Sequence, residues 1–473
     1  MNRSILTIII LLVSFSIATG QLKHNVKTPA DPATIPLPQS ERGTVLDTVM
    51  QDSKIYPSTR RRIQVFVPAQ YDASNPACLV VGLDGNLFDA ITVIGNLVKS
   101  GEMPVTIGLF VEPGVSYAPD GSVIRYNRSN EFDRINGEFA SFLETEVLPM
   151  VESITLPDGK PLLISKNPAD RAITGASSSG IAAFTVAWER PDLFSRVYSS
   201  VGTFVAMRGG NEYPALIRKH EPKRLRIFLQ DGVNDTWNHI FGDWWEYNQL
   251  MSSALNFAGY EFDFKWDRGT HSIYYGTRAY PDAMRWLWRG WPAEIQKGKS
   301  MNGLLQSLLV EGQEWQLAEE LPEEVRKMER TVKTSDGRYA ALYPNHKLMV
   351  TTEENSNWLI SHIIKEDGSL EAGQRFYWLH NRDNHTLTPI GNMVFDTYGN
   401  LYVATSMGIQ VCDQNGRVRA ILAPDGKSNV EKVFLLGSKL YAFAGGKWYV
   451  RTIGHTGYNP LQGPIDVKSQ GQG

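Results

Sequence analysis

Cysteine is nearly absent from this chain, and histidine is scarce. The 473 residues contain two cysteines, Cys78 and Cys412, and nine histidines. Two distant cysteines cannot form a disulfide framework, so we expect two buried thiols in strand-like runs, with a single bridge as the alternative. No cysteine–histidine group has the spacing of a metal site. We therefore predict that the protein binds no metal and needs no cofactor.

Charge of one sign is also lacking. The formal net charge is −3 and no long basic stripe occurs, so nucleic acid is a poor candidate partner. One apolar run stands out, from Ile5 to Ala18, after a short positive start and before the small residues Ala18-Thr19-Gly20. It is shorter than the ~18 residues of a membrane span. We predict a secretory signal peptide over residues 1–20 that is cleaved before Gln21.

Cleavage there would leave an exported protein, secreted or periplasmic, with no stable membrane span. Because no cysteine follows the cleavage position, a lipoprotein anchor is not expected. Residues 21–42 are rich in proline and polar residues, and they are expected to form a flexible leader.

The length and the pattern of the remaining chain predict two domains. From residue 43 to 291, apolar runs alternate with longer helical stretches. The runs are almost continuously apolar, as in strands covered on both faces, which indicates an α/β domain with a mostly parallel sheet. The expected strands cover residues 61–68, 77–83, 105–111, 171–174, 195–201, 225–230 and 261–266.

Residues 292–340 lose this pattern and are interpreted as a connector. From 341 to 473, short strands are separated by Gly, Asp and Asn turns, which predicts an all-β segment. The stretch 396–418 is typical of one propeller blade, and the segment has room for two or three blades. An incomplete propeller, a small sandwich and a sheet that docks on the first domain all remain possible.

The stretch "GASSSG" (175–180) joins an expected strand directly to an expected helix. A turn that sharp predicts a nucleophile elbow, in which small flanking residues let strand and helix approach closely. Ser177 is the preferred nucleophile because Gly175 precedes it by two residues, although Ser179 stands where the pattern has glycine. Ser178, flanked by Ala176 and Gly180, is the second frame. A Gly/Ser turn without chemistry is the alternative to both.

A serine nucleophile needs a base and an orienting carboxylate, in the chain order Ser, acid, His for this fold. His271 follows the last expected strand and is the preferred base, with His239 as its rival. Asp235 lies in the loop beyond the strand 225–230 and is preferred as the acid. Asp231 directly ends that strand and is better explained as a structural residue that holds the turn.

An oxyanion in the transition state also needs hydrogen-bond donors. One candidate is the backbone N–H of Ser178, immediately after the nucleophile. The other is the backbone N–H of Gly85 or of Asn86, in the loop after the strand 77–83.

Several ordered stretches carry a family resemblance. "GASSSGIAAFTVAWERPDLF", "VVGLDGNLFD", "GEMPVTIGLFVEPG", "RSNEFD", "DGVND" and "PDAMRWLW" resemble the enterochelin-esterase and feruloyl-esterase type of α/β-hydrolase over residues 43–291. The resemblance implies an α/β-hydrolase fold and a serine esterase with Ser177, Asp235 and His271 as its triad.

The same resemblance implies a substrate pocket. It places Arg128 and Glu131 of "RSNEFD" at the pocket, where a surface ion pair is the alternative interpretation. Trp237 and Trp244, with Trp245, crowd the acid loop. They could stack on a sugar or phenolic ring, or they could belong to the core of a helix.

The C-terminal stretch "DTYGNLYVATSMGIQVCDQNGRV" resembles the gluconolactonase and regucalcin propeller. That family binds a divalent metal through Glu, Asn and Asp residues. Here Ile390, in the stretch 389–393, stands where the resemblance would place a carboxylate. We therefore expect a binding or packing module without a metal lactonase site.

These observations favour an exported serine esterase that acts on a small-molecule or carbohydrate ester. The resemblance implies acetyl or feruloyl esters of carbohydrates, or a siderophore ester, and the sequence does not separate these. Two other classes stay open. One is a non-catalytic carbohydrate-binding protein on a hydrolase scaffold, and the other is a metal-dependent lactonase in the C-terminal segment.

Overall fold

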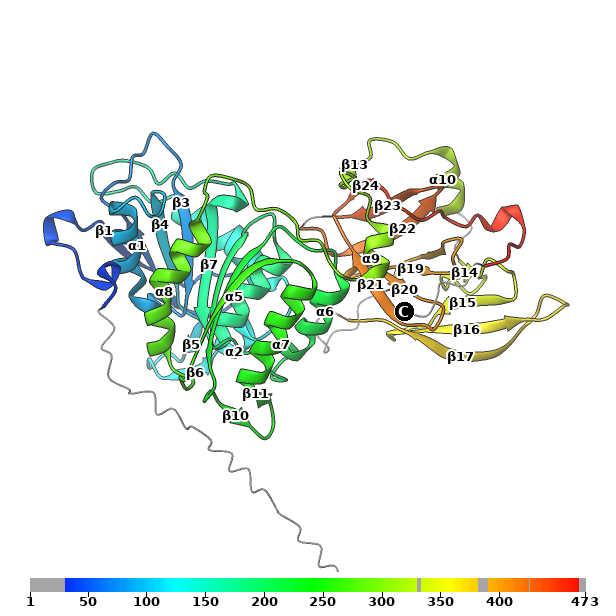
Figure 1. Ribbon diagram of the computed structural model, residues 1–473, viewed down its shortest axis with the longest axis horizontal. Coiled ribbons are helices and arrows are strands. Elements are labelled where there is room, and N and C mark those ends of the chain that lie inside the picture. Colours follow the sequence, from blue (N-terminus) through cyan, green and yellow to red (C-terminus); the bar gives the residue numbers. More distant parts are fainter. Residues whose placement is uncertain (1–29, 330–332, 382–389, 425, 468–473) are drawn as a thin grey trace, which may run out of the picture.

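The computed structural model of this chain describes residues 30–329, 333–381, 390–424 and 426–467. The predicted signal peptide and the first part of the predicted leader lie outside these ranges. Figure 1 shows two parts side by side, an α/β part that begins near the N-terminus and a β-rich part that ends the chain. Within the described ranges, every helix is too short or too polar to span a bilayer.

The α/β part is built on one eight-stranded sheet in the order β1-β2-β4-β3-β7-β8-β9-β12. The strands from β4 to β12 in that order run parallel, and β1 and β2 are antiparallel at one edge. This order and direction define an α/β-hydrolase fold, as the sequence predicted. The strands are β1 (Thr44–Met50), β2 (Arg61–Val67), β3 (Cys78–Leu83), β4 (Thr106–Val111), β7 (Arg171–Ala176), β8 (Arg196–Ser200), β9 (Arg226–Gly232) and β12 (Glu261–Asp267).

Helices cover both faces of this sheet. β3, β4, β7, β8 and β9 are buried along their whole length, which is why their sequences are almost continuously apolar. One face packs on α1 and α8, and the other packs on α3 to α7. The helices are α1 (Ala90–Lys99), α2 (Arg128–Phe132), α3 (Glu138–Phe142), α4 (Leu148–Glu152), α5 (Ser178–Glu189), α6 (Tyr213–Lys219), α7 (Trp244–Phe257) and α8 (Ile273–Trp288).

Two small hairpins project from this part. β5 (Val115–Tyr117) pairs with β6 (Val123–Tyr126), and β10 (Trp237–Asn238) pairs with β11 (Gly242–Asp243). The β10–β11 hairpin hangs at the lower edge of the molecule in Figure 1.

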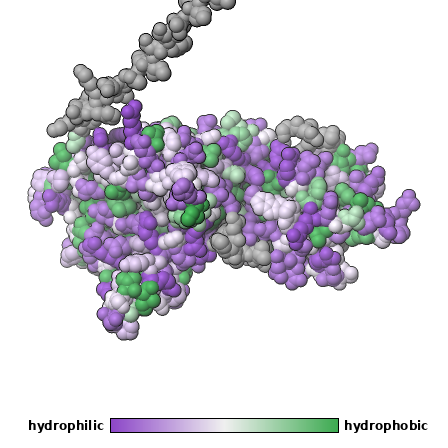
Figure 2. Space-filling model, turned by 90° about the horizontal axis from the view of Figure 1, so that it is seen from below, coloured by the Kyte–Doolittle hydropathy of each residue, from purple (hydrophilic) through white to green (hydrophobic). Residues whose placement is uncertain are grey.

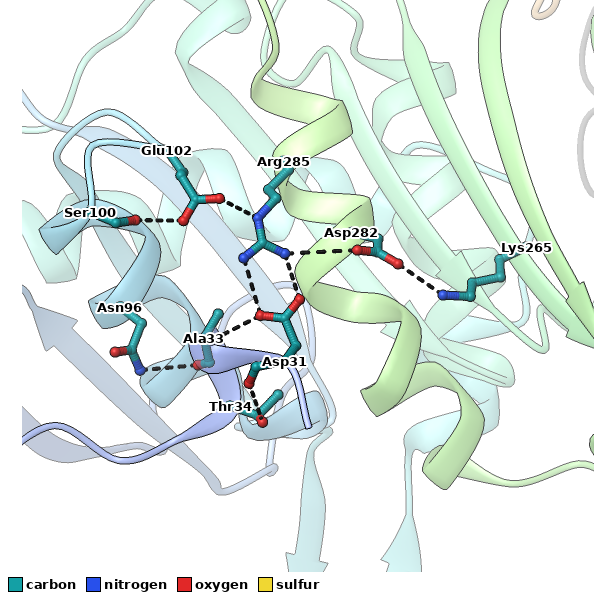
Figure 3. Close-up of polar contacts among 9 residues, drawn as sticks. All are labelled: Asp31, Ala33, Thr34, Asn96, Ser100, Glu102, Lys265, Asp282 and Arg285. Atoms are coloured by element: carbon teal, nitrogen blue, oxygen red, sulfur yellow. Dashed lines mark hydrogen bonds and ion pairs between the residues drawn. The ribbon is translucent and has the colours of Figure 1, made fainter. Parts of the chain in front are cut away.

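The end of the predicted flexible leader is anchored on the domain instead. Arg285 on α8 pairs with Asp31 at 2.7 Å and also with Glu102 (Figure 3). Asn96 on α1 donates to the carbonyl of Ala33 at 3.0 Å, and the Ala33 side chain is buried. Asp31 and Ala33 therefore anchor this stretch on α8 and α1. The composition of residues 21–42 alone could not reveal these contacts.

The C-terminal part consists of three four-stranded antiparallel sheets, with orders β14-β15-β16-β17, β18-β19-β20-β21 and β13-β24-β23-β22. Strand β18 contacts both β14 and β22, so the first strands of the three meanders lie together. The strands are β14 (Ala340–Leu342), β15 (Leu348–Thr352), β16 (Trp358–Ile364), β17 (Leu370–Trp378), β18 (Met393–Phe395), β19 (Leu401–Thr405), β20 (Gly408–Cys412), β21 (Val418–Leu422), β22 (Val430–Leu436), β23 (Lys439–Ala444) and β24 (Lys447–Thr452).

The stretch expected as a connector belongs largely to this C-terminal part. It contains α9 (Gly303–Leu308), β13 (Gln316–Leu317) and α10 (Glu323–Glu329). Leu305 and Leu308 on α9 are fully buried in the C-terminal core, and β13 pairs with β24. Apolar residues of this stretch therefore complete a core that lies further along the chain.

The two cysteines are buried free thiols, as the sequence predicted. Cys78 lies in β3 and Cys412 in β20, which are strands of different sheets. Burial raises the pKa of both thiols, so neither is a reactive thiolate.

Candidate active site

Ser177 occupies a sharp corner between β7 and α5. Its backbone has φ 58° and ψ −122°, a region that non-glycine residues rarely adopt. A Cβ atom on Gly175 would lie 2.1 Å from the carbonyl oxygen of Ser179, so only glycine fits there. Strand and helix thus approach as closely as a nucleophile elbow requires.

The two serines that follow are turned away from the corner. Ser178 begins α5 and is buried. Ser179 is fully buried, and its hydroxyl donates to the Ala176 carbonyl at 2.7 Å and accepts from the Ala176 N–H at 2.9 Å. A serine two residues after the corner therefore ties the helix to the end of β7, which explains why serine fits where the family pattern has glycine.

The structure brings Ser177, His271 and Asp235 into one hydrogen-bonded chain. His271 Nε2 lies 2.8 Å from Ser177 Oγ, and His271 Nδ1 lies 2.7 Å from Asp235 Oδ1. The Asp235 side chain has no exposed surface, whereas 28% of the His271 side chain is exposed. This is the order and reach of a nucleophile, a base and an orienting acid.

Backbone hydrogen bonds hold the acid loop against the base loop. The N–H groups of Val233 and Asn234 donate to the carbonyls of Asp267 and Gly269, each at 3.0 Å. β9 and β12 are parallel neighbours, so their carboxyl ends release both loops at the same edge of the sheet. That edge also holds Ser177 at the end of β7.

Thr203 is a neighbour of the nucleophile that the sequence interpretation missed. Its Oγ1 lies 3.3 Å from Ser177 Oγ and accepts a hydrogen bond from Trp244 Nε1 at 3.2 Å. It follows β8, the strand next to β7. Its position just after the expected strand 195–201 could have indicated a site residue. No motif around Thr203 distinguishes it from other residues after strands.

His239, the alternative candidate for the base, lies outside the Ser177–His271–Asp235 chain. It belongs to the turn of the β10–β11 hairpin, and its ring contacts that of Trp237 with centroids 4.3 Å apart. His271 instead contacts Trp244, with ring centroids 5.6 Å apart. Of the two histidines, His271 is the one in contact with Ser177.

The candidate oxyanion donors differ in their availability. Ser178 is the first residue of α5, and the first N–H groups of a helix have no acceptor within it. The Gly85 N–H donates to the Val111 carbonyl at 3.3 Å, so it is the weaker of the two loop candidates. Asn86 follows two residues with positive φ, Asp84 and Gly85, and its backbone N–H is the better one.

Arg128 makes a bidentate ion pair with Asp84, with contacts of 2.8 and 2.6 Å. Its guanidinium remains partly exposed. Because Asp84 directly precedes Gly85 and Asn86, Arg128 braces the loop that carries the candidate oxyanion donors. The two residues lie 44 positions apart in the sequence, so no local pattern predicts their pairing.

Glu131 cannot touch a substrate, contrary to the expectation from the sequence. Neither its side chain nor that of Arg61 has exposed surface. The two form a buried bidentate pair at 2.6 and 2.9 Å, so the surface ion pair is wrong as well. Glu131 also accepts the Gly114 N–H at 3.3 Å, which makes it an internal anchor.

The three tryptophans of the acid region separate into different environments. Trp237 is 60% exposed, whereas Trp244 is buried. The ring of Trp245 contacts that of Trp266 edge-on, with centroids 5.3 Å apart. Trp237 is therefore the most exposed of the three, and Trp244 acts on the site through Thr203 and His271.

A second Ser–His–Asp chain lies in the C-terminal part. His455 Nδ1 is 2.7 Å from Asp396 and its Nε2 is 3.1 Å from Ser307 Oγ. Ser307 donates to the carbonyl of Leu304 within α9, and Asp396 already accepts the N–H groups of Tyr398 and Asn400. This trio lacks a strained corner and acts as a tether between α9 and the sheets.

In the described parts of the chain, no three His, Cys, Asp or Glu side chains cluster as metal ligands would. Asn392, from the stretch compared with the lactonase site, bonds the backbone of Val433 through both ends of its amide at 2.7 Å. Its amide is therefore committed to β22. Pro389 of the same stretch lies outside the described residues.

Residues 56–285 match the family model described as "Putative esterase". This segment contains Ser177, Asp235, His271 and both loops with candidate oxyanion donors. The match agrees with the esterase resemblance of the first domain and supports a carboxylic ester hydrolase. No match was found among curated proteins.

Solved esterase structures are similar to about half of this chain. A ferulic acid esterase has 18% identity and a TM-score of 0.40, over 52% of this chain and 98% of that one. The Shigella flexneri enterobactin esterase has 18% identity and a TM-score of 0.40, over 55% of this chain and 60% of that one. The feruloyl esterase module from Clostridium thermocellum has 14% identity and a TM-score of 0.39, over 56% and 94%.

Proposed function

We propose that this protein is a serine carboxylic ester hydrolase with Ser177 as nucleophile, His271 as base and Asp235 as orienting acid. The observation that carries the proposal is the hydrogen-bonded chain from Ser177 Oγ through His271 to Asp235, at 2.8 and 2.7 Å. It begins at a strained corner whose hydroxyl faces the base. The family match over residues 56–285 supports the same reaction class.

In the first half-reaction, Ser177 Oγ attacks the ester carbonyl carbon while His271 Nε2 accepts the hydroxyl proton. The carbonyl oxygen becomes an oxyanion, which the N–H groups of Ser178 and Asn86 stabilise in this proposal. His271 then gives its proton to the leaving alcohol, the C–O bond breaks and an acyl-enzyme remains. Water releases the acid in the second half-reaction by the same proton transfers.

Exposed aromatic side chains that follow Asp235 and His271 closely in the sequence favour an ester with an aromatic or sugar component. Large apolar side chains that face solvent follow or precede the site residues closely in the sequence. They are Ile124, Tyr126, Trp237, Ile240 and Tyr274. Seen from below, the molecule carries small hydrophobic patches, one of them on a projection of the N-terminal side (Figure 2). The rings of Tyr126, Trp237 and Tyr274 can stack on a phenolic acyl group or on a sugar.

A panel of acetyl, feruloyl and catecholate esters tests the reaction and the substrate class together. We expect hydrolysis that is unaffected by EDTA and abolished in Ser177→Ala. Hydrolysis that stops with EDTA and persists in Ser177→Ala would indicate a metal lactonase instead. Binding of a glycan without turnover of any ester would indicate a non-catalytic scaffold.

We further propose that the protein is exported, on the strength of residues 1–20 alone. N-terminal sequencing of the protein from the extracellular or periplasmic fraction should give a chain that begins at Gln21. A start at Met1 in that fraction would contradict the cleavage.

A further inference from the structure

Asp231 is a buried carboxyl group beside the proposed active site. It is the second-last residue of β9 and is completely buried. An ionised carboxylate in such a position is costly unless hydrogen-bond donors or positive charges surround it. Its partners therefore decide which form it takes.

Donors serve only one of its two oxygens. Oδ1 accepts the N–H of Gly232 at 2.7 Å. Oδ2 is buried and has no N–H or O–H partner within the described ranges. The sequence predicts that Asp231 holds the turn, and the hydrogen bond to Gly232 agrees with that role. The role does not explain why Oδ2 is buried without a donor.

Asp235 also has one carboxylate oxygen without a hydrogen-bond donor. Its Oδ1 accepts from His271 and from the N–H of Thr236. Its Oδ2 is buried and likewise has no N–H or O–H donor in the described structure. The two carboxyl groups are within hydrogen-bond contact of each other. Two such oxygens can stay together only if one of them carries a proton.

We propose that Asp231 is a neutral carboxylic acid that donates a hydrogen bond to Oδ2 of Asp235, and is thereby a positioning residue for the acid of the triad. One proton lies between the two carboxyl groups, and no proton is transferred away from the pair during the reaction. The hydrogen bond holds Oδ2, so that Oδ1 stays directed at His271 Nδ1. This catalytic role rests on the proposed function, whereas the protonation of Asp231 does not.

The charges around the pair favour this arrangement. Burial, the hydrogen bond to Asp235 and the negative charge of Asp235 raise the pKa of Asp231 to about 10, and Asp267 adds to the effect. Burial works against ionisation of Asp235 too, but the hydrogen bonds from His271 and Asp231 hold its pKa below the ordinary value. His271 faces Asp235, and its charge favours the ionised form of Asp235.

Asp231→Asn tests the role directly. Its amide can donate to Asp235 Oδ2 while its carbonyl accepts the Gly232 N–H, so it reproduces both bonds without a titrating proton. We expect kcat within about threefold of the wild type. Asp231→Ala removes the donor, and we expect kcat to fall by roughly 10–100-fold at little change in KM, since the missing bond serves the triad and not substrate binding.

Infrared difference spectroscopy at pH 7 tests the proton independently of activity. The wild type and Ser177→Ala should both show the carbonyl band of a buried carboxylic acid, and Asp231→Asn should lack it. Asp267→Asn is the matched control, since its carboxylate accepts the Gln230 amide at 3.3 Å, and it should keep the band.

A wild-type spectrum without the band would overturn the inference, as would an Asp231→Asn variant as impaired as Asp231→Ala. If the band is present but the wild type hydrolyses no ester, the proposed function fails and the shared proton stands. If esters are hydrolysed and the band is missing, the inference alone fails.

Discussion

Three adjacent serines differ in role because the chain turns between the first and the second. Ser177 carries the strain of the corner, with φ at 58°. The hydroxyl of Ser179 forms hydrogen bonds with both the N–H and the carbonyl of Ala176. A run of three similar residues therefore divides into one reactive hydroxyl, one helix-start residue and one internal tie.

Ser177→Ala should reduce kcat by roughly 10⁴-fold or more, with no loss of folded protein. The hydroxyl is the atom that His271 contacts, so nothing else in the site can replace it. Ester hydrolysis under saturating substrate measures the effect. Ser178→Ala is the matched control, and it should retain activity within about tenfold. A larger loss in Ser178→Ala than in Ser177→Ala would assign the nucleophile to the second frame.

Asp231 should also set how stability depends on pH. Its folded-state pKa is about 10 and its ordinary value is 3.8, so between these values the folded protein retains a proton that the unfolded chain releases. Stability must therefore fall as pH rises from about 4 to about 10. Asp231→Asn removes this dependence, because an amide does not titrate in that range.

We expect Asp231→Asn to gain several degrees in melting temperature over the wild type at pH 8, and little at pH 4. Asp235 has a lowered pKa and changes stability only at pH below about 4, outside this window. Thermal unfolding of both proteins at several pH values checks the trend. An advantage that is equal at both pH values would show that Asp231 is ionised in the folded protein.

At the scale of elements, the β7–α5 junction is built on glycine. A Cβ on Gly175 would overlap the Ser179 carbonyl at 2.1 Å, and backbone cannot move aside as a flexible side chain can. Gly175→Ala should therefore destabilise the fold by about 1–3 kcal/mol and displace Ser177 from His271. Melting temperature and kcat together measure both effects.

Gly303→Ala is the control for that change. Gly303 begins α9, and a Cβ there meets no atom within 4 Å. It should melt at the temperature of the wild type or slightly above. If Gly175→Ala behaved in the same way, the close approach of β7 and α5 would be refuted.

Contacts that a local sequence pattern marks could be predicted, whereas contacts between distant residues without such a pattern could not. The elbow and the order Ser177, Asp235, His271 depend on turn residues that follow expected strands, so the sequence could place them together. The burial of Glu131 depends on Arg61, which lies 70 residues earlier. Likewise β13 pairs with β24, which lies far along the chain. No local pattern carries that information.

At the scale of the whole molecule, the C-terminal part docks far from the proposed site. It contacts the end of α5 through Ser428 and Glu189, and it pairs with the residue after α6 through His220 and Ile421. Ser177 lies at the other end of α5, whose 12 residues span about 18 Å. The C-terminal part can therefore support the domain or bind elsewhere, but it does not complete the triad.

One buried polar contact of this interface is the pair of Glu221 with Arg451, at 2.6 Å and with side chains only 9% and 4% exposed. Glu221→Ala leaves the Arg451 charge buried without that carboxylate, at a cost of about 3–5 kcal/mol. We expect the melting temperature to fall by roughly 5–15 °C and calorimetry to resolve two transitions, because the docked parts then unfold separately. Ester hydrolysis at 25 °C should persist, since the triad lies at the opposite end of α5.

Glu311→Ala is the control for this change. It removes a fully solvated partner of Lys299 at 3.9 Å and should leave the melting temperature unchanged. A single transition at the wild-type temperature in Glu221→Ala would mean that the two parts do not depend on this pair for their docking.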